Sequence, residues 1–291
     1  MMLQRGLEVY LECLRNKNVE NLFVGNDGRI AARFFNARLS SVFQAIRSEQ
    51  NLELLAYEAM VRSFSINDTG LSILKLLEHA TTDDESIELD RLCRLLHVLN
   101  FFRQNSGPNI DLYLSVHSRL LTAVAGNHGA AFQRVLTSLD IPQQRIVLQL
   151  PAITPSQGWA VAHVAKNYRR NGFRFAVHAR TVEQAYELLD SVNPDVLKLN
   201  AENALTENEL GRFDKLLSTA ARQQCRVILR KVDQINWLRQ RPTSSQQPTA
   251  FGIQGNAVDI ARSVLPASPH NGLVPTAVAK AGYRDTQQCC I

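Results

Sequence analysis

From about residue 50 onward, the chain alternates between short apolar runs and segments in which apolar residues recur at helical spacing. A short run bounded by polar residues is typical of a buried strand, and a repeat at three- and four-residue intervals is typical of an amphipathic helix. Predicted strands cover 52–63, 145–152, 173–179, 195–200 and 225–232, and a further alternating strand begins at 111. Predicted helices cover 86–104, 129–140, 156–172, 181–192, 207–224 and 232–241.

Strands that alternate with helices in this way indicate a parallel sheet with crossover helices. The number of strand–helix units favours a closed barrel over an open sheet. In a barrel of this kind, functional side chains lie at the C-terminal ends of the strands. The polar residues at or near the predicted strand ends are Glu58, Arg62, His117, Gln149, His178, Lys198, Asn200 and Arg230.

The segments on either side of this pattern predict a three-part chain. Residues 1–38 indicate a helix followed by a short hairpin around 24–29, and we treat them as an N-terminal extension. The barrel then covers 39–265, with a polar, proline-containing loop at 240–249. Residues 266–291 lack sustained periodicity and predict a loosely ordered C-terminal tail.

Composition adds limits on the class of protein. The 291 residues are 45% hydrophobic and 20% charged, as in an ordinary soluble globular protein. The formal charge of +5 is dispersed along the chain, which gives little support for a nucleic-acid partner. No apolar stretch reaches the roughly 18 to 20 residues of a membrane span, and the N-terminus lacks the layout of a signal peptide. The five cysteines form no metal-binding or redox pattern, so we expect reduced thiols and a cytoplasmic location.

The stretch LLAYEAMVRSF, residues 54–64, places Glu58 and Arg62 in an otherwise apolar predicted strand. A salt bridge at a strand end would explain the pair. Half of a nucleotide-binding site would explain it equally well, so the choice between them depends on the other strand ends.

Eight short segments follow one another at or near those strand ends. They are SVFQAI (41–46), YEAMVRS (57–63), LSVHS (114–118), IVLQLP (146–151), FAVHART (175–181), VLKLN (196–200), VILRKVD (227–233) and AFGIQG (250–255). In this order they resemble the motifs of the EAL family, bacterial phosphodiesterases of cyclic di-GMP. The signature Glu-Ala-Leu corresponds to Glu58-Ala59-Met60, with Arg62 as the trailing arginine. The resemblance implies an α/β fold, a modified (β/α)8 TIM-like barrel of EAL type with an N-terminal extension.

The same resemblance implies a catalytic site that this chain has largely lost. The family holds two divalent metal ions with carboxylates and an asparagine, and hard cations need several charged oxygen ligands. Glu58 and Lys198 match the family, and Asp233 replaces its last acid. The other vestigial positions have changed, to His117 from asparagine, Gln149 from glutamate, His178 and Ala179 from paired aspartates, Asn200 from aspartate and Arg230 from glutamate. We therefore expect no catalytic residues, no bound metal and no cofactor.

Several of these residues also have simpler interpretations. Glu58 with Arg62 or Arg230 would form a salt bridge at the barrel mouth, and Lys198 would be a strand-end lysine facing the old cavity. His117 and His178 suggest zinc or nickel ligands, but the sequence supplies no third ligand, which favours hydrogen-bonded histidines. The apolar positions Val182, Ala185, Leu188 and Leu189 of one predicted helix fit either a dimer interface or the face packed on the barrel.

These considerations predict a catalytically inactive EAL-like bacterial regulatory protein. It would act through protein–protein interaction in motility, biofilm or transcriptional control, with a partner protein that the sequence does not identify. The alternative is a metal-independent receptor of cyclic di-GMP, with Arg62, Lys198 and Arg230 as phosphate-binding residues. A residual phosphodiesterase ranks third, and a homodimer stays open.

Overall fold

The structure is a computed structural model, and it describes residues 5–16, 21–65, 68–69, 82–104, 110–117, 128–151, 158–206, 208–233 and 250–266. Its helices are α1 (Arg5–Asn16), α3 (Asp83–Phe102), α5 (His128–Ser138), α6 (Gly158–Arg170), α7 (Val182–Val192), α8 (Ala201–Ala204) and α9 (Leu210–Arg222), with a 3₁₀ helix at Gln143–Arg145. Its strands are β1 (Leu22–Val24), β2 (Ile30–Phe34), β3 (Ala37–Ser48), β4 (Leu54–Ser65), β5 (Asp68–Thr69), β6 (Asp111–Ser115), β7 (Ile146–Gln149), β8 (Arg174–Ala179), β9 (Val196–Asn200), β10 (Arg226–Arg230) and β11 (Gly252–Ile253). Most of the helix predicted over 232–241, all of the loop at 240–249 and nearly all of the tail lie outside the described residues.

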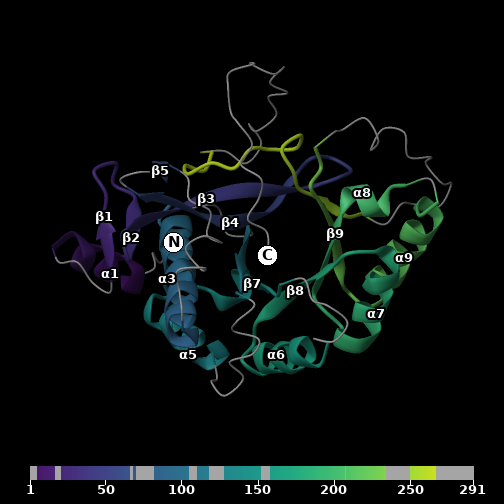
Figure 1. The fold of residues 1–291 in the computed structure, drawn as a ribbon, viewed down its shortest axis with the longest axis horizontal. Helices are drawn as coiled ribbons and strands as arrows, with labels where there is room; N and C mark the ends of the chain where they lie inside the picture. The colour runs from purple at the N-terminus through teal and green to yellow at the C-terminus, as the bar shows by residue number, and fades with distance from the viewer. Residues whose placement is uncertain are drawn as a thin grey trace.

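Eight strands close into a barrel. Their order is β3, β11, β10, β9, β8, β7, β6 and β4, and β4 pairs back with β3. The seven strands other than β3 run parallel to one another, whereas β3 is antiparallel to both of its neighbours. Figure 1 shows α3, α5, α6, α7 and α9 around the outside of the strands. The predicted (β/α) barrel is confirmed, in the modified form with one antiparallel strand.

Helix boundaries follow local sequence signals. At the start of α3, Thr82 accepts a hydrogen bond from the backbone N–H of Glu85, and the Glu85 side chain accepts one from the N–H of Thr82. This capping box satisfies backbone groups that a helix start leaves unpaired. After α6, Gly172 takes a left-handed conformation with φ of 74°, as the sequence predicted for the end of that helix.

The long antiparallel strand β3 did not appear among the predicted strands. Eight of its twelve residues are buried, because one face packs toward α3 and the other toward the barrel interior. Ser41, on the outer face, lies 2.8 Å from Nδ1 of His97 in α3. A strand covered on both faces has no clean alternation of polar and apolar residues. Strand β11 and helix α8 were missed because they are too short to show a period.

The apolar positions of α7 are buried within the chain itself. Val182, Ala185, Leu188 and Leu189 all belong to the main hydrophobic core. Of the two interpretations of this helix face, packing on the barrel is the one that the structure shows.

The N-terminal segment continues the barrel sheet. Strands β1 and β2 form an antiparallel hairpin whose turn includes Gly28, with φ of 71°. Strand β2 then pairs with β3, and the pair Ala32↔Leu39 joins the two sides of the predicted boundary between residues 38 and 39. The separation of an extension at that boundary stays a prediction.

Candidate functional site

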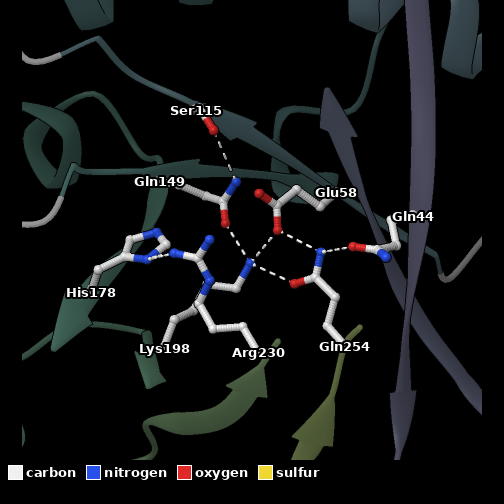
Figure 2. A network of polar contacts seen from close by, with 8 residues as sticks. All are labelled: Gln44, Glu58, Ser115, Gln149, His178, Lys198, Arg230 and Gln254. Atoms are coloured by element: carbon white, nitrogen blue, oxygen red, sulfur yellow. Dashed lines mark hydrogen bonds and ion pairs between the residues drawn. The ribbon is translucent and has the colours of Figure 1, made fainter. Parts of the chain in front are cut away.

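A ring of polar side chains lies one layer above an apolar layer inside the barrel. The apolar layer consists of Ile46, Ala56, Tyr113, Val147, Ala176, Val196 and Ile228. Residues two positions apart on a strand point to the same face, so the next interior layer consists of Gln44, Glu58, Ser115, Gln149, His178, Lys198 and Arg230. Gln254, directly after β11, adds an eighth side chain to this layer. Two residues before it, Gly252 lies at the level of the apolar layer, and a Cβ at Gly252 would lie only 3.0 Å from the Ile228 side chain. We call this ring the polar layer, and Figure 2 shows its eight side chains.

The Lys198 ammonium lies at the centre of three oxygen acceptors. Its Nζ donates to Glu58 Oε2 at 2.6 Å, to Gln149 Oε1 at 2.6 Å and to Gln254 Oε1 at 3.1 Å. The side chain is completely buried, and a lysine ammonium has three N–H donors. The described residues therefore satisfy each of those donors (Figure 2).

Glu58 is the carboxylate that balances this ammonium. Burial alone would raise its pKa, but the charges of Lys198 and Arg230 and the hydrogen bonds from Lys198 and Gln254 hold the pKa well below the ordinary range. Glu58 is consequently ionised at neutral pH, and it forms a buried ion pair with Lys198. The salt bridge expected for Glu58 therefore forms with a different cation, because its partner is neither Arg62 nor Arg230.

Two glutamines extend the network toward the segment after β11. Gln254 Nε2 donates to Glu58 Oε2 at 2.7 Å and to Gln44 Oε1 at 3.2 Å. Gln44 Nε2 in turn donates to the backbone oxygen of Asp259 at 3.1 Å. The segments SVFQAI and AFGIQG contain both glutamines, so the motifs carried a signal that the predicted site left out.

The other side of the polar layer holds a guanidinium against an imidazole. Arg230 Nη1 lies 2.6 Å from His178 Nδ1. An arginine donates at every nitrogen, so Nδ1 accepts this bond and the imidazole is neutral. Burial, followed by the charges of Arg230 and Lys198, lowers the pKa of His178 well below its ordinary value. No ion pair joins Arg230 to a carboxylate within the described parts of the chain.

The structure thus brings five of the predicted site residues together, namely Glu58, Gln149, His178, Lys198 and Arg230. Ala179 is buried in the main core and faces away from the ring, since it follows the inward-facing His178. Arg62 lies four residues beyond Glu58 on the same strand face, opposite Ser40, and is exposed.

The remaining predicted residues lie at the strand ends or beyond them. His117 follows β6, and its backbone N–H donates to Asp90 Oδ1 at 2.9 Å. Asn200 is half-buried at the end of β9 and precedes α8. Asp233 is exposed after β10. These three side chains are not part of the described hydrogen-bond network around Lys198.

The polar layer does not fit a pair of divalent cations. Glu58 is its one carboxylate, and the amide oxygens of Gln149 and Gln254 point at the same ammonium. The Nδ1 lone pair of His178 is occupied by Arg230. Among the described residues, no group of three or more His, Cys, Asp or Glu side chains is arranged to hold a metal ion.

A family comparison matches residues 29–247 to the EAL domain. The match covers most of the chain, which therefore belongs to the EAL domain family. No curated protein sequence matches the chain. Among the described helices, none is long and apolar enough to cross a membrane.

Solved EAL domains share the fold at low sequence identity. The Bacillus subtilis YkuI protein, with an EAL domain and in complex with substrate c-di-GMP and calcium, aligns with a TM-score of 0.61 and 15% identity over 78% of this chain and 57% of that one. The match thus spans less than two thirds of YkuI. The FimX EAL domain from Pseudomonas aeruginosa bound to c-di-GMP aligns with a TM-score of 0.61 and 15% identity over 77% and 91% of the two chains. A standalone versatile EAL protein from Vibrio cholerae O395, in a c-di-GMP-bound form, gives 0.58 and 14% over 78% and 94%. At these identities the likeness shows the fold alone.

Proposed function

We propose that this protein is a catalytically inactive EAL-domain regulator that acts by binding another protein. The observation that carries the proposal is the position of the Lys198 ammonium, which fills the oxygen cluster around Glu58. A buried cation already balances the one carboxylate of the polar layer.

Electrostatics support the loss of metal-dependent hydrolysis. Two unit charges about 4 Å apart interact by about 4 kcal/mol at an effective dielectric constant near 20. A divalent cation beside Glu58 would meet like charges on Lys198 and Arg230, and it would have to displace three hydrogen bonds of the ammonium. Hydrolysis assisted by two metals needs both ions in place.

A binding role is supported by what the chain retains. The barrel keeps its closed strand order and a continuous core, while the donors of Lys198 and Gln254 bond to oxygen acceptors of the same polar layer. A fold alone does not determine a function. Because the hydrogen bonds around Glu58 and Lys198 are already made within the barrel, we place the interaction with a partner on the surface.

The test is hydrolysis of cyclic di-GMP by the full chain with Mg²⁺ or Mn²⁺, beside an active EAL phosphodiesterase as positive control. We expect no linear pGpG above a no-enzyme blank. Product that appears with metal and disappears in Glu58→Gln would overturn the inactive assignment.

A metal-independent receptor of cyclic di-GMP is the second candidate, and Arg230 is the observation that favours it. This guanidinium is 9% exposed and contacts a neutral imidazole rather than a carboxylate. A phosphate would supply the missing negative charge. Lys198 is a weaker anchor than the sequence suggested, because three acceptors already occupy its ammonium.

Titration with labelled cyclic di-GMP, with and without EDTA, separates the two candidates. Binding that resists EDTA and weakens at least about tenfold in Arg230→Gln, a loss of about 1.4 kcal/mol, would select the receptor. Absence of binding at high micromolar ligand in low salt would leave the protein-binding role.

A further inference from the structure

Four arginines gather on the N-terminal hairpin, away from the polar layer. We name Arg29, Arg33, Arg38 and Arg103 the hairpin arginine patch. Arg33 and Arg38 are exposed, and Arg29 and Arg103 are half-buried. They come from β2, β3, the β1–β2 turn and the residue after α3. Strand β2 pairs with β3 and contacts α3, and Figure 1 shows β1 and β2 at the left side of the molecule.

The patch places like charges directly opposite each other. Arg33 and Arg38 are register partners across β2 and β3, an arrangement that destabilises a sheet. Each guanidinium lies 5.4 Å from the centre of the Phe23 ring on β1. Among the described residues, no acid forms an ion pair with either arginine. A guanidinium stacked on a ring still presents its in-plane N–H donors at the edge.

Asp27 is a nearby acid, and its carboxylate already accepts hydrogen bonds from Arg29. Arg29 Nε donates to Asp27 Oδ2 at 2.7 Å. A side-chain hydrogen bond from Arg29, assisted by the charges of Arg29 and Arg38, lowers the pKa of Asp27. Arg103 donates to the backbone oxygen of Gly28. Asp27 thus interacts with Arg29, Arg38 and Arg103. Among the described residues no second acid is found to pair with the four arginines, which leaves the patch with a positive excess.

We propose that the hairpin arginine patch binds an acidic segment of a partner protein. This inference rests on the proposed function, because it supplies the contact surface that a protein-binding regulator needs. The carboxylates of the segment would meet the donor edges of Arg33 and Arg38, in the fork geometry that guanidinium and carboxylate groups share. Phe35, at the turn between β2 and β3, is 51% exposed and offers an apolar contact next to them.

The make-up of the patch favours a protein over a nucleic acid. Its charges are all arginines, accompanied by Phe23 and Phe35, and protein interfaces are enriched in arginine and aromatic residues and depleted in lysine. Single-stranded nucleic acids are held by bases stacked on free aromatic faces. Here two guanidinium groups already contact the Phe23 ring.

The experiment measures fluorescence anisotropy of a labelled synthetic peptide that alternates glutamate and leucine, with the full chain in low salt. The test variant is Arg33→Gln/Arg38→Gln. The control is Arg91→Gln/Arg134→Gln, which removes the same charge from exposed positions on α3 and α5. We expect the peptide to bind, to be released by added salt, and to bind at least about tenfold more weakly to the test variant alone. Arg33→Lys/Arg38→Lys should recover only part of the affinity, because lysine lacks the fork.

Two further probes, a polyuridine RNA and vesicles containing phosphatidylserine, complete the design. No peptide binding, equal losses in test and control variants, or tighter binding of the RNA or the vesicles would overturn the proposal. The hydrolysis assay is independent of these measurements. A failed peptide assay with no hydrolysis removes the patch alone, whereas metal-dependent hydrolysis removes the proposed function itself.

Discussion

On the side of the polar layer formed by β4, β7, β9 and β11, the Lys198 ammonium is surrounded by oxygen acceptors. On the side formed by β8 and β10, the Arg230 guanidinium rests against a neutral imidazole. Both sides bury a cation in the same barrel, with Lys198 fully buried and Arg230 9% exposed. The first matches it with a carboxylate, and the second contributes no negative charge of its own.

This difference separates the part of the polar layer that stabilises the fold from the part that has charge left for binding a ligand. A buried ion pair with every donor satisfied resists the removal of either partner, because the remaining charge would stay buried. Among the described residues the Arg230 guanidinium has no carboxylate partner, so its charge is not balanced there. We therefore regard the Lys198 side as a structural element of the barrel and the Arg230 side as the part of the polar layer that is able to bind an anion.

The largest expected effect comes from breaking the compensated side. Lys198→Met leaves the Glu58 carboxylate buried without its ammonium, and we expect a loss of about 3 to 5 kcal/mol in the free energy of unfolding. Urea titration of the variant measures this loss. Lys215→Met, at an exposed position on α9, should change stability by no more than about 0.5 kcal/mol.

The double variant Glu58→Gln/Lys198→Met sharpens the same result. It removes both charges, so part of the lost stability should return. A Lys198→Met variant as stable as the parent protein would show that the ion pair does not stabilise the barrel.

The two sides of the polar layer should lose their contributions to stability in different pH ranges. The folded-state pKa of Glu58 is lowered, so its contribution is present above the unfolded pKa and is lost as pH falls below about 4.3. The folded-state pKa of His178 is also lowered, by burial and then by Arg230 and Lys198. The unfolded chain therefore takes up that proton first, and stability should begin to fall below about pH 6.5.

Each group contributes a slope of at most about 1.4 kcal/mol per pH unit. Buried His97, whose pKa burial lowers to about 3, acts in the same upper window. Urea titrations at several pH values between neutral and pH 4 give the free energy of unfolding at each pH. This free energy should fall less steeply with falling pH in His178→Gln, and still less steeply when His97→Gln is added. A slope that neither substitution changes would contradict this assignment.

The smallest expected effect is that of Arg230→Gln on stability. The substitution removes a cation that has no carboxylate partner among the described residues and lies near Lys198, so we expect a change within about 1 kcal/mol. The pKa of His178 should rise, because one of the charges that lowers it is gone. Histidine NMR signals followed through a pH titration measure the shift. A stability loss as large as that of Lys198→Met would show that the Arg230 side also stabilises the barrel, and would contradict the distinction between the two sides.

Much of the fold could be predicted because its strands and helices have distinct periods. The alternation after residue 50 corresponds to β4, to β6 through β10 and to helices α3, α5, α6, α7 and α9, and Gly172 marked the end of α6 correctly. Strand β3 escaped because burial on both faces hides its alternation, although its Gln44 closes the hydrogen-bond network. Gln254 escaped for a similar reason, since β11 has only two residues.

The sequence by itself determined which residue types stand at the inner face of each strand. On most strands of the barrel, a polar residue stands two positions after the apolar interior residue. The charges of the polar layer could therefore be predicted from the sequence alone. Only the tertiary structure decided the pairing. Glu58 and Lys198 are 140 residues apart, and their meeting depends on closure of the barrel, which sets the distance and depth of every side chain in the layer. Arg62, only four residues from Glu58, lies exposed beyond it, because along a strand each two-residue step moves a side chain by roughly 7 Å.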